Sequence, residues 1–423
     1  MQKTAPTAPA PTAPITPARS AAFTILLRIA TTSAHSDDLL HGPALNALSQ
    51  PDRNLATTLV LGVLRWQIAL DARIQPLLQR PDQPLPEPVA IALRLGAFQL
   101  LHLDRIPAHA ALSESVELVR AAGHPHAAGM VNAILRNLTR QTPTKPKLYE
   151  TTAAMAERLG HPLWLVNRWV QNYGRSAAEA ICTYGQQEPH PGSLFPGEDN
   201  LPHLDDGSRL VAELAAAAHP VAARIWDTCA APGGKTLILQ HRHSTAHILA
   251  TDANSRRLQS LTTRLETAAP RVRTLLSDAA QLPTTEGAFD LILCDVPCSG
   301  TGTLGRNPEL RNRLQPSDLP CQATRQREIL IAALTHLAPG GNLLYSTCSL
   351  EPEENEQVVA AALAASSGIT AISLEPTLNR LLDNSILPTP APASLLREGN
   401  LRTLPGANFQ GDGFFAALLH RPL

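Results

Sequence analysis

Two cysteine motifs lie late in the chain, where they could supply covalent chemistry. Asp295 to Cys298 reads DVPC and Ser346 to Ser349 reads STCS, and each follows a short apolar run. A thiolate is a strong nucleophile, and nearby cations or helix N-termini make it more available by lowering the thiol pKa. If both runs are parallel strands of one sheet, Cys298 and Cys348 point to one crevice and could act on one substrate. The simpler alternative is that each is a small buried residue.

The four other cysteines are expected to be buried structural residues. Zinc is the third use of cysteine to consider, because Cys294 and Cys298 have acceptable spacing for two ligands. No second close Cys or His pair follows them, so no metal site is predicted. Six cysteines in a chain of 423 residues without a signal peptide predict a reducing, cytoplasmic compartment. The four residues expected to be structural are Cys182, Cys229, Cys294 and Cys321.

A glycine pair follows an earlier apolar run and predicts a ligand-binding turn. The segment from Asp227 to Thr236 reads DTCAAPGGKT, and glycine lets a backbone approach a ligand just before a helix. A P-loop would need glycine five residues before Gly234, where Cys229 stands. The G-x-G-x-x-G dinucleotide motif is also absent. Triphosphate and dinucleotide binding are therefore both disfavoured.

Acidic residues close the next two runs and favour a nucleoside ligand. Asp252 lies 18 residues after Gly234, where a carboxylate can accept hydrogen bonds from a ribose diol. Asp278 closes the third run and could meet an adenine edge. A nucleoside without a pyrophosphate, of which S-adenosylmethionine is the common example, fits this series. Taken singly, each carboxylate could equally be a helix N-cap.

The elements that must position these residues form an α/β domain in the second half. Short apolar runs ending in polar residues alternate with segments long enough for helices, which is typical of a Rossmann-like, doubly wound parallel sheet. The predicted strands are 224–230, 247–252, 273–278, 289–297 and 342–349.

The first half is predicted to be all-α, because its apolar residues recur at spacings of three and four, with Pro and Gly between the runs. The predicted helices are 19–30, 54–70, 88–103, 111–123 and 127–140, with a further short one within 161–174. The predicted organisation is a disordered Pro/Ala/Thr-rich tail over 1–20, a helical domain over 21–138, a linker and short connecting region over 139–205, and the α/β domain over 206–423.

Composition narrows the possible partners. The chain has 44% apolar and 17% charged residues and a net charge of −1, which excludes a uniformly basic or acidic protein. Residues 1–150 carry 14 basic and 10 acidic residues, so the helical half is the better candidate for touching an RNA backbone. Of the 35 basic residues 31 are Arg, which suits phosphate forks or reflects genome composition. No membrane-spanning run is expected.

These motifs together resemble a known family. In order and spacing, DTCAAPGGKT, DVPCSGTG, STCS and the late DGFFAALL are similar to those of the S-adenosylmethionine-dependent RNA cytosine-5 methyltransferases. The segments DRNLATTLVLGVLRWQ, LRLGAFQLLHLDRIPAHAALSESVELVR and MVNAILRN resemble a NusB-type RNA-binding domain. With HPLWLVNRW between the halves, the combination is similar to the branch that methylates 16S ribosomal RNA. The likeness covers nearly everything from Ala21 onward.

The resemblance implies a role for each motif. Cys348 is the nucleophile that adds to C6 of cytosine, and Cys298 serves the later release step. Asp295 lies near N3 of the base and against the cofactor. Asp252 holds the ribose and Asp278 the adenine. The cofactor loop comprises Cys229, Ala230, Ala231, Pro232, Gly233, Gly234 and Lys235. The implied cofactor is S-adenosylmethionine, the implied partner is RNA, most simply 16S ribosomal RNA, and the protein is expected to be a monomer without metal.

Two departures from the family pattern and two alternative functions remain. The stretch between Tyr173 and Asp205 is shorter than in the family, which bears on site choice. Asn312 stands where the family usually has Trp, so a substrate-side contact is expected to be missing. The alternatives are the same chemistry on another RNA, such as transfer RNA, and a non-catalytic RNA-binding assembly or antitermination factor.

Overall fold

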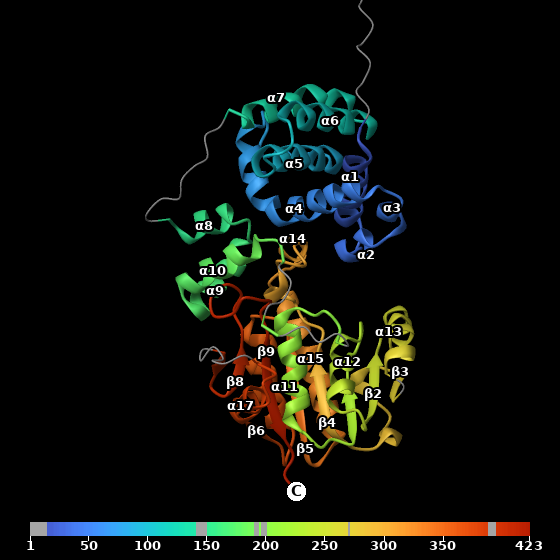
Figure 1. Cartoon of the computed structure of the whole chain (residues 1–423). Helices are drawn as coiled ribbons and strands as arrows, with labels where there is room; N and C mark the ends of the chain where they lie inside the picture. Colours follow the sequence, from blue (N-terminus) through green and yellow to red (C-terminus); the bar gives the residue numbers. More distant parts are fainter. Residues whose placement is uncertain (1–14, 141–149, 190–193, 196–200, 270, 388–394) are drawn as a thin grey trace, which may run out of the picture. The chain divides into compact units, whose positions relative to one another are not determined.

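The structure, a computed structural model, describes residues 15–140, 150–189, 194–195, 201–269, 271–387 and 395–423 (Figure 1). They divide into two compact units. The helical unit comprises the chain up to Trp169 together with Asn307–Asn312, and the sheet unit comprises Val170–Arg306 and Arg313–Leu423. Three predicted regions lie partly outside the described residues. They are the tail, at residues 1–14, the linker, at 141–149, and the shortened stretch after Tyr173, at 190–193 and 196–200.

The helical unit confirms the predicted all-α domain. Its apolar residues, spaced at three and four, face one shared core in which α5 lies against α4, α6 and α7. The helices are α1 (Pro17–Thr31), α2 (Ser36–Leu40), α3 (Pro43–Asn46), α4 (Gln50–Ile74), α5 (Glu87–His102), α6 (Ala108–Ala121), α7 (Ala128–Leu138) and α8 (Thr152–Arg158).

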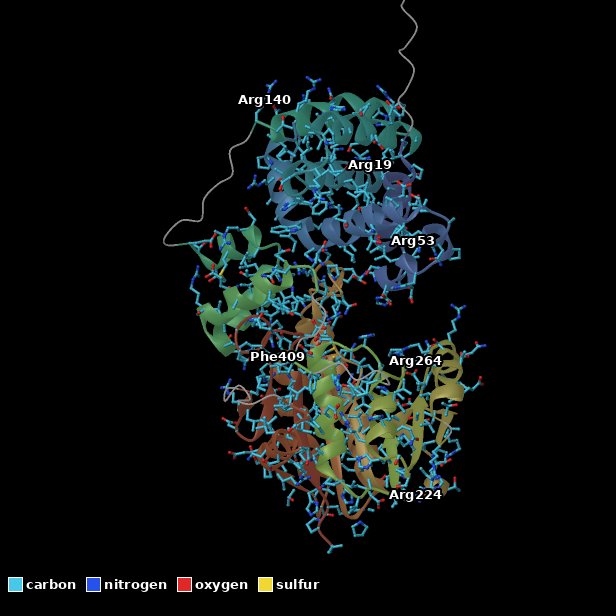
Figure 2. All side chains as sticks on the ribbon, viewed as in Figure 1. Arg19, Arg53, Arg140, Arg224, Arg264 and Phe409 are labelled. Atoms are coloured by element: carbon cyan, nitrogen blue, oxygen red, sulfur yellow. The ribbon has the colours of Figure 1, made fainter. Side chains whose placement is uncertain are left out.

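Helix α1 begins inside the segment that was predicted to be a disordered tail, so that prediction is wrong for residues 17–20. Pro17 suits the first helical turn, where its missing N–H costs nothing. Arg19, labelled in Figure 2, is buried and donates to Gln99 Oε1 at 2.7 Å and to Glu114 Oε1 at 2.8 Å. The hydrogen bonds from this buried arginine to α5 and α6 fix the first turn of α1. Composition alone does not reveal that Arg19 has these partners.

The stretch Gln50–Leu77 is long and apolar enough to cross a membrane by length and composition, and it is the only one of its kind among the residues described. Buried core helices pass the same test. Leu59, Val60 and Val63 of α4 are fully or almost fully buried against the other helices, and the ends of α4 carry Asp52 and Arg73. The helix is therefore accounted for by the core of the helical unit.

The region predicted as linker contains more helix than expected. The predicted helix within 161–174 is α9 (Leu163–Tyr173). Helices α8 and α10 (Arg175–Gly185) flank it and were not predicted. Helix α8 has only 7 residues and so few periods of apolar spacing, but α10 is as long as the predicted α9, so length does not explain why it was missed.

The sheet unit confirms the predicted α/β architecture but not a purely parallel sheet. All five predicted strands form, in the order β3-β2-β1-β4-β5, and they are parallel. Strand β9 then pairs antiparallel with β5, and β6 and β8 pair antiparallel with β9. The strands are β1 (Arg224–Asp227), β2 (His247–Asp252), β3 (Val272–Leu276), β4 (Phe289–Asp295), β5 (Leu337–Thr347), β6 (Thr370–Ile372), β7 (Leu396–Arg397), β8 (Asn400–Arg402) and β9 (Phe415–His420).

Helices cover both faces of this sheet and bury its central strands (Figure 1). Side chains from β1, β4 and β5 enter two apolar clusters, one shared with α11 and α17 and the other with α15 and α16. Strand order reverses between β1 and β4, and ligands of such sheets bind beyond the carboxyl ends at this point. The helices of this unit are α11 (Asp206–Ala218), α12 (Gly234–Arg242), α13 (Ser255–Ala268), α15 (Asp318–Thr335), α16 (Glu356–Ala365) and α17 (Glu375–Asp383). The short α14 (Leu310–Arg313) begins in the segment Asn307–Asn312, which belongs to the helical unit.

Candidate active site

The two motif cysteines meet beyond the ends of neighbouring strands. Cys298 follows β4 and Cys348 follows β5, and Asp295 and Ser346 are partners in the parallel register of these strands. The two Sγ atoms lie 3.2 Å apart, within hydrogen-bond distance for sulfur. Both side chains are partly exposed. The prediction that both thiols face one crevice is therefore confirmed.

The loops that carry the cysteines are joined by backbone contacts. Gly302 N donates to Cys348 O at 2.9 Å, and Leu350 N donates to Thr301 Oγ1 at 2.8 Å. A Cβ added at Gly302 would lie 2.3 Å from Gly413 O and 2.9 Å from Cys348 O. Position 302 in DVPCSGTG must therefore be glycine, because any side chain would push the two loops apart.

A partly buried ion pair lies beside the thiols. Lys235 Nζ is 2.8 Å from Asp295 Oδ2, and Ser346 Oγ donates to Asp295 Oδ1 at 2.7 Å. Burial lowers the pKa of Lys235, but the charge and hydrogen bond of Asp295, with smaller effects from Cys348 and Asp227, raise it overall. Lys235 is thus a cation held by an ion pair near Cys348. The sequence predicts only a place in the cofactor loop for Lys235. Its position beside a glycine pair, in a chain with 4 lysines, could have indicated a role for its side chain.

The two thiols are not equivalent electrically. The pKa of Cys298 is raised well above its ordinary value, chiefly by its hydrogen bond with Cys348. Burial and the charges of Cys348 and Glu354 add to the shift, and the Gly300 backbone N–H opposes it. Cys298 therefore holds its proton more tightly than an isolated thiol would.

The turn after β1 has features that fit an amino-acid carboxylate. Gly233 adopts φ +97°, and a Cβ there would lie 2.5 Å from Leu261 Cδ1. Helix α12 follows directly, with no side chain capping its N-terminus. Its first-turn N–H groups and the positive end of its dipole suit the methionine end of the cofactor. Thr236 Oγ1 donates to Oδ2 of the buried Asp227 at 2.7 Å and so ties the first turn of α12 to the end of β1.

Asp252 and Asp278 lie at the ends of β2 and β3 as predicted, but they differ in burial and in their partners. Asp252 is buried, and its Oδ1 accepts from Asn254 N at 2.8 Å. Asp278 is partly exposed, accepts from Ala280 N at 2.9 Å and is paired with Arg325. Asp278 therefore also has the helix-capping role that the sequence left open. A backbone bond from Ser277 N to Asp252 O at 3.3 Å links the two strand ends.

Two arginines of α13 hold the predicted cofactor loop from outside. Arg257 donates to Ala231 O at 2.9 Å and Arg264, labelled in Figure 2, donates to Pro232 O at 3.3 Å. Loop residues 231 and 232 are joined by a cis peptide bond. These contacts were not predicted, because charged residues on an exposed helix usually face only solvent.

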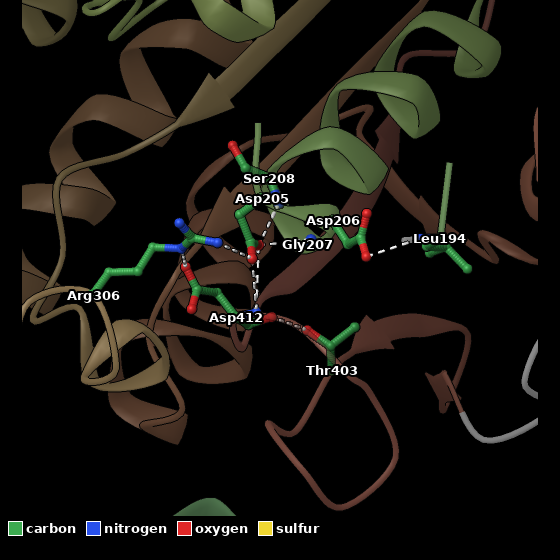
Figure 3. A network of polar contacts seen from close by, with 8 residues as sticks. All are labelled: Leu194, Asp205, Asp206, Gly207, Ser208, Arg306, Thr403 and Asp412. Carbon is green, nitrogen blue, oxygen red and sulfur yellow. Dashed lines mark hydrogen bonds and ion pairs between the residues drawn. The ribbon is translucent and has the colours of Figure 1, made fainter. Parts of the chain in front are cut away.

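A second ion-pair network fixes the far end of the Cys298 loop (Figure 3). Arg306 lies 3.0 Å from Asp205 Oδ2 and 2.8 Å from Asp412 Oδ2. Asp205 also accepts from Gly207 N and Ser208 N, so it caps α11. Burial and the charge of Asp205 raise the pKa of Asp412 to about 7, against the opposing effect of Arg306. The loop is thereby tied both to α11 and to the residues leading into β9.

The remaining cysteines are mostly structural. Cys182 and Cys294 are buried as expected, and Cys229 is partly buried, which raises its pKa to about 12. Cys321 is exposed, so its predicted burial is wrong: its position on α15 faces solvent. Within the described part of the chain, no three His, Cys, Asp or Glu side chains are grouped closely enough to hold a metal ion.

The segment Asn307–Asn312 belongs to the helical unit. Glu309 is buried there and accepts from Ser36 N at 3.1 Å and Ser36 Oγ at 2.9 Å. Arg311 donates to Arg65 O at 2.9 Å. Asn312, expected to mark a missing substrate contact, donates to Leu64 O at 3.4 Å. Position 312 thus has an intramolecular partner.

Comparisons with known proteins agree with both units. The family described as 16S rRNA methyltransferase RsmB/F matches residues 216–420, and the NusB family matches residues 16–140. A ribosomal RNA small subunit methyltransferase B of Xanthomonas campestris is 32% identical over 89% of this chain and 91% of its own. That of Citrobacter koseri is 31% identical over 89% and 92%. A probable one of Bacillus subtilis is 28% identical over 96% and 99%.

Among solved structures, protein PH0851 superposes with a TM-score of 0.71 over 97% of this chain and all of its own, at 21% identity, which supports the fold. Relatives above 30% identity over 89% of the chain, together with one family match in each half, leave one assignment. The chain belongs to the RsmB/F family of S-adenosylmethionine-dependent RNA methyltransferases, with a NusB domain at its N-terminus.

Proposed function

We propose that this enzyme transfers a methyl group to C5 of one cytosine in 16S ribosomal RNA, through a covalent bond between Cys348 and C6. The observation that carries the proposal is the 3.2 Å approach of the Cys298 and Cys348 sulfurs beside the Lys235–Asp295 ion pair. The names of the relatives, which are small subunit ribosomal RNA methyltransferases, support the RNA class. We further propose that it acts as a cytoplasmic monomer and without a metal.

The first step uses the charge distribution of the site. Cytosine C5 is a poor nucleophile, so the Cys348 thiolate adds to C6 and moves the electron pair of the C5–C6 double bond onto C5. Asp295, paired with the Lys235 ammonium, would lie near N3 of the base, and this ion pair would help to offset the charge that develops as the thiolate adds. The target base must leave its stack first, which costs a few kcal/mol.

Methyl transfer and release complete the cycle. S-adenosylmethionine supplies an electrophilic methyl group on a sulfonium, which C5 attacks as the sulfur–methyl bond breaks. In the resulting adduct Cys348 no longer shares a hydrogen bond with Cys298, so the largest cause of the raised Cys298 pKa is removed. Cys298 then loses its proton to solvent and takes the proton from C5. The C5–H electron pair restores the C5–C6 double bond, and the Cys348 thiolate leaves.

Residues of the predicted cofactor site have matching tasks. The backbone of Cys229 to Gly234 would surround the methionine end, Asp252 would accept from the ribose, and Asp278 would face the adenine. Arg257 and Arg264 would keep this turn closed through its carbonyl groups.

Bisulfite sequencing of 16S ribosomal RNA tests both the reaction and its address. RNA from cells with and without the gene should differ at one cytosine that resists conversion only when the gene is present. Transfer RNA from the same cells serves as the comparison. A protected cytosine in transfer RNA instead would move the substrate, and no gene-dependent protection in either RNA would reject the proposal.

A further inference from the structure

One buried carboxylate connects the two cysteine loops. Glu354 ends the short turn Pro352–Glu354 after β5, and none of its surface is exposed. Its Oε1 accepts from Ser299 N at 2.9 Å, and its Oε2 accepts from the hydroxyl groups of Ser299 and Ser349. Ser299 follows Cys298 and Ser349 follows Cys348. The carboxylate therefore contacts the residue after each cysteine.

The contacts around Glu354 leave the two loops little freedom. Gln326 Nε2 donates to Glu354 Oε1 at 2.9 Å and to Pro297 O at 2.9 Å, so α15 holds the carboxylate and the Cys298 loop together. Ser299 Oγ and Ser349 Oγ are also 3.0 Å apart. Tyr345 Oη donates to Glu354 O at 2.6 Å and fixes its backbone.

A buried charge is costly unless donors surround it, and hydrophobic side chains of the same volume would often stabilise a fold as well or better. Four donors converge on Glu354, whereas the described residues provide no ion-pair partner for it. The arrangement instead has a geometric result: one rigid acceptor sets the spacing of two separate loops. Reacting groups misplaced by about 1 Å can lose about 100-fold in rate.

We propose that Glu354 is a positioning residue that holds Cys298 and Cys348 at reacting distance, by accepting hydrogen bonds from the residue that follows each of them. The inference rests on the proposed covalent mechanism for its catalytic meaning. The charge of Glu354 is also one of the causes that raise the pKa of Cys298, after the larger effects of the Cys348 hydrogen bond and of burial. Loss of Glu354 should therefore make the Cys298 thiol more reactive relative to Cys348.

The test measures the thiols without requiring methylation. The full-length protein is treated with limiting iodoacetamide, and the labelled cysteines are counted by peptide mass spectrometry. The wild type should label Cys348 well before Cys298. In Glu354→Gln the Cys348-to-Cys298 ratio should fall by about tenfold, which corresponds to about 1.4 kcal/mol. Glu354→Asp keeps the charge and should restore part of the ratio.

Two further variants separate positioning from general stability. Glu213→Gln removes another buried carboxylate. Glu213 lies on α11 and is paired at 2.8 Å with Arg242 of α12. It should lower the melting temperature and leave the labelling ratio unchanged. If Glu354→Gln does not fold, the double variant Ser299→Ala/Ser349→Ala decides, because it removes the two hydroxyl contacts between the loops and Glu354 Oε2 and keeps the carboxylate.

Single-turnover methylation of RNA provides the second measurement. Glu354→Gln should be about 10- to 100-fold slower with unchanged affinity for S-adenosylmethionine and RNA. An unchanged labelling ratio in both Glu354→Gln and the double serine variant would overturn the inference. A ratio that depends on Glu354 in a protein that methylates no RNA would instead leave the positioning role standing and reject the proposed function.

Discussion

The ends of β4 and β5 differ from the ends of β2 and β3 in how their polar side chains are held. At β4 and β5, Ser299, Ser349 and Glu354 are buried and bonded to one another across two loops. At β2 and β3, Asp252 and Asp278 accept mainly from backbone groups two residues further along their own chain. Contacts distant in sequence dominate the first region, whereas the carboxylates of the second are held by local backbone caps, to which Asp278 adds the distant ion pair with Arg325.

This difference indicates which part of the site must be rigid for the proposed reaction. The proposed covalent mechanism requires two sulfurs at a fixed spacing, and the contacts among Ser299, Ser349 and Glu354 hold the thiol region rigid. The hydroxyl groups of a bound nucleoside can add to the local contacts of Asp252 and Asp278 without moving a strand. Substitutions at the thiol region should therefore affect rate, and those at β2 and β3 should affect affinity.

Cys348→Ala should have the largest effect, because it removes the nucleophile. Methylation of RNA should fall by at least about 10⁴-fold, since C5 remains unactivated. Incorporation of labelled methyl groups measures it. Cys321→Ser is the matched control, an exposed thiol on α15 whose loss should leave the rate within about twofold. A Cys348→Ala enzyme with appreciable turnover would assign the nucleophile elsewhere.

Cys298→Ala should block the cycle at a later point. Adduct formation and methyl transfer need only Cys348, whereas release needs a base at C5, so the enzyme should stop after one turnover, attached to RNA. A slow-migrating band on a denaturing gel reports this, and multiple turnover should fall by about 10³-fold. The double variant with Cys348→Ala should show no such band. Normal release by Cys298→Ala would remove the residue from this step.

Much of the thiol region could be read from the sequence, because its chemistry lies in residue types at strand ends. Apolar runs predicted the strands, and parallel strand ends predicted that Cys298 and Cys348 would meet. The partners of these residues could not be predicted in the same way. Glu354 is one of several acids in SLEPEENE, and nothing in that pattern shows which carboxylate turns inward.

The fold shows the same limit. Short apolar runs predicted the central strands and spacings of three and four predicted the long helices, but neither predicted the direction of β9. Its motif DGFFAALL is apolar after Asp412 and Gly413, as expected for a strand buried on both faces, and does not reveal whether it runs parallel to β5. Arg306 and Asp412 were likewise unpredictable as a pair, since 106 residues separate them.

Asp252→Ala should weaken cofactor binding while leaving the fold largely intact. Losing hydrogen bonds to a charged acceptor costs about 1.5–3 kcal/mol, which predicts a Kd for S-adenosylmethionine raised by about 10- to 100-fold. Isothermal titration calorimetry measures it. Asp290→Asn is the control, because Asp290 accepts from Ala223 N and Arg224 N where β4 begins, at the opposite end of the sheet. Unchanged affinity in Asp252→Ala would remove Asp252 from the site.

Asp278→Asn should have a smaller effect on the same affinity. Asparagine can still accept from Ala280 N, so the cap is kept and only the charge toward Arg325 is lost. We expect a Kd raised by about twofold to fivefold, in line with a partly exposed pair worth under about 1 kcal/mol. Arg325→Gln isolates the ion pair. If Asp278→Asn weakens binding as much as Asp252→Ala, the two carboxylates contribute equally to cofactor binding. The expected difference between the buried Asp252 and the partly exposed, capping Asp278 would then be wrong.

The smallest effect concerns Asp227, at the end of β1 between the two regions. Burial raises its pKa from 3.8 to about 7, against the opposing hydrogen bond from Thr236. The folded state therefore binds this proton more tightly than the unfolded state, so its stabilising contribution is complete below about pH 4 and is lost as pH rises to about 7. Asp227→Asn lacks this loss.

The melting temperature of the variant relative to the wild type should therefore rise by a few °C between about pH 5 and about pH 8. Scanning calorimetry at both pH values measures the change. Asp412→Asn, whose carboxyl pKa is also raised to about 7, should change in the same direction. A difference independent of pH in Asp227→Asn would mean that Asp227 is ionised in the fold, stabilised by Lys235 across the switch point. The cation would then serve both β1 and β4, and the thiol region would extend further toward the cofactor turn than its hydrogen bonds indicate.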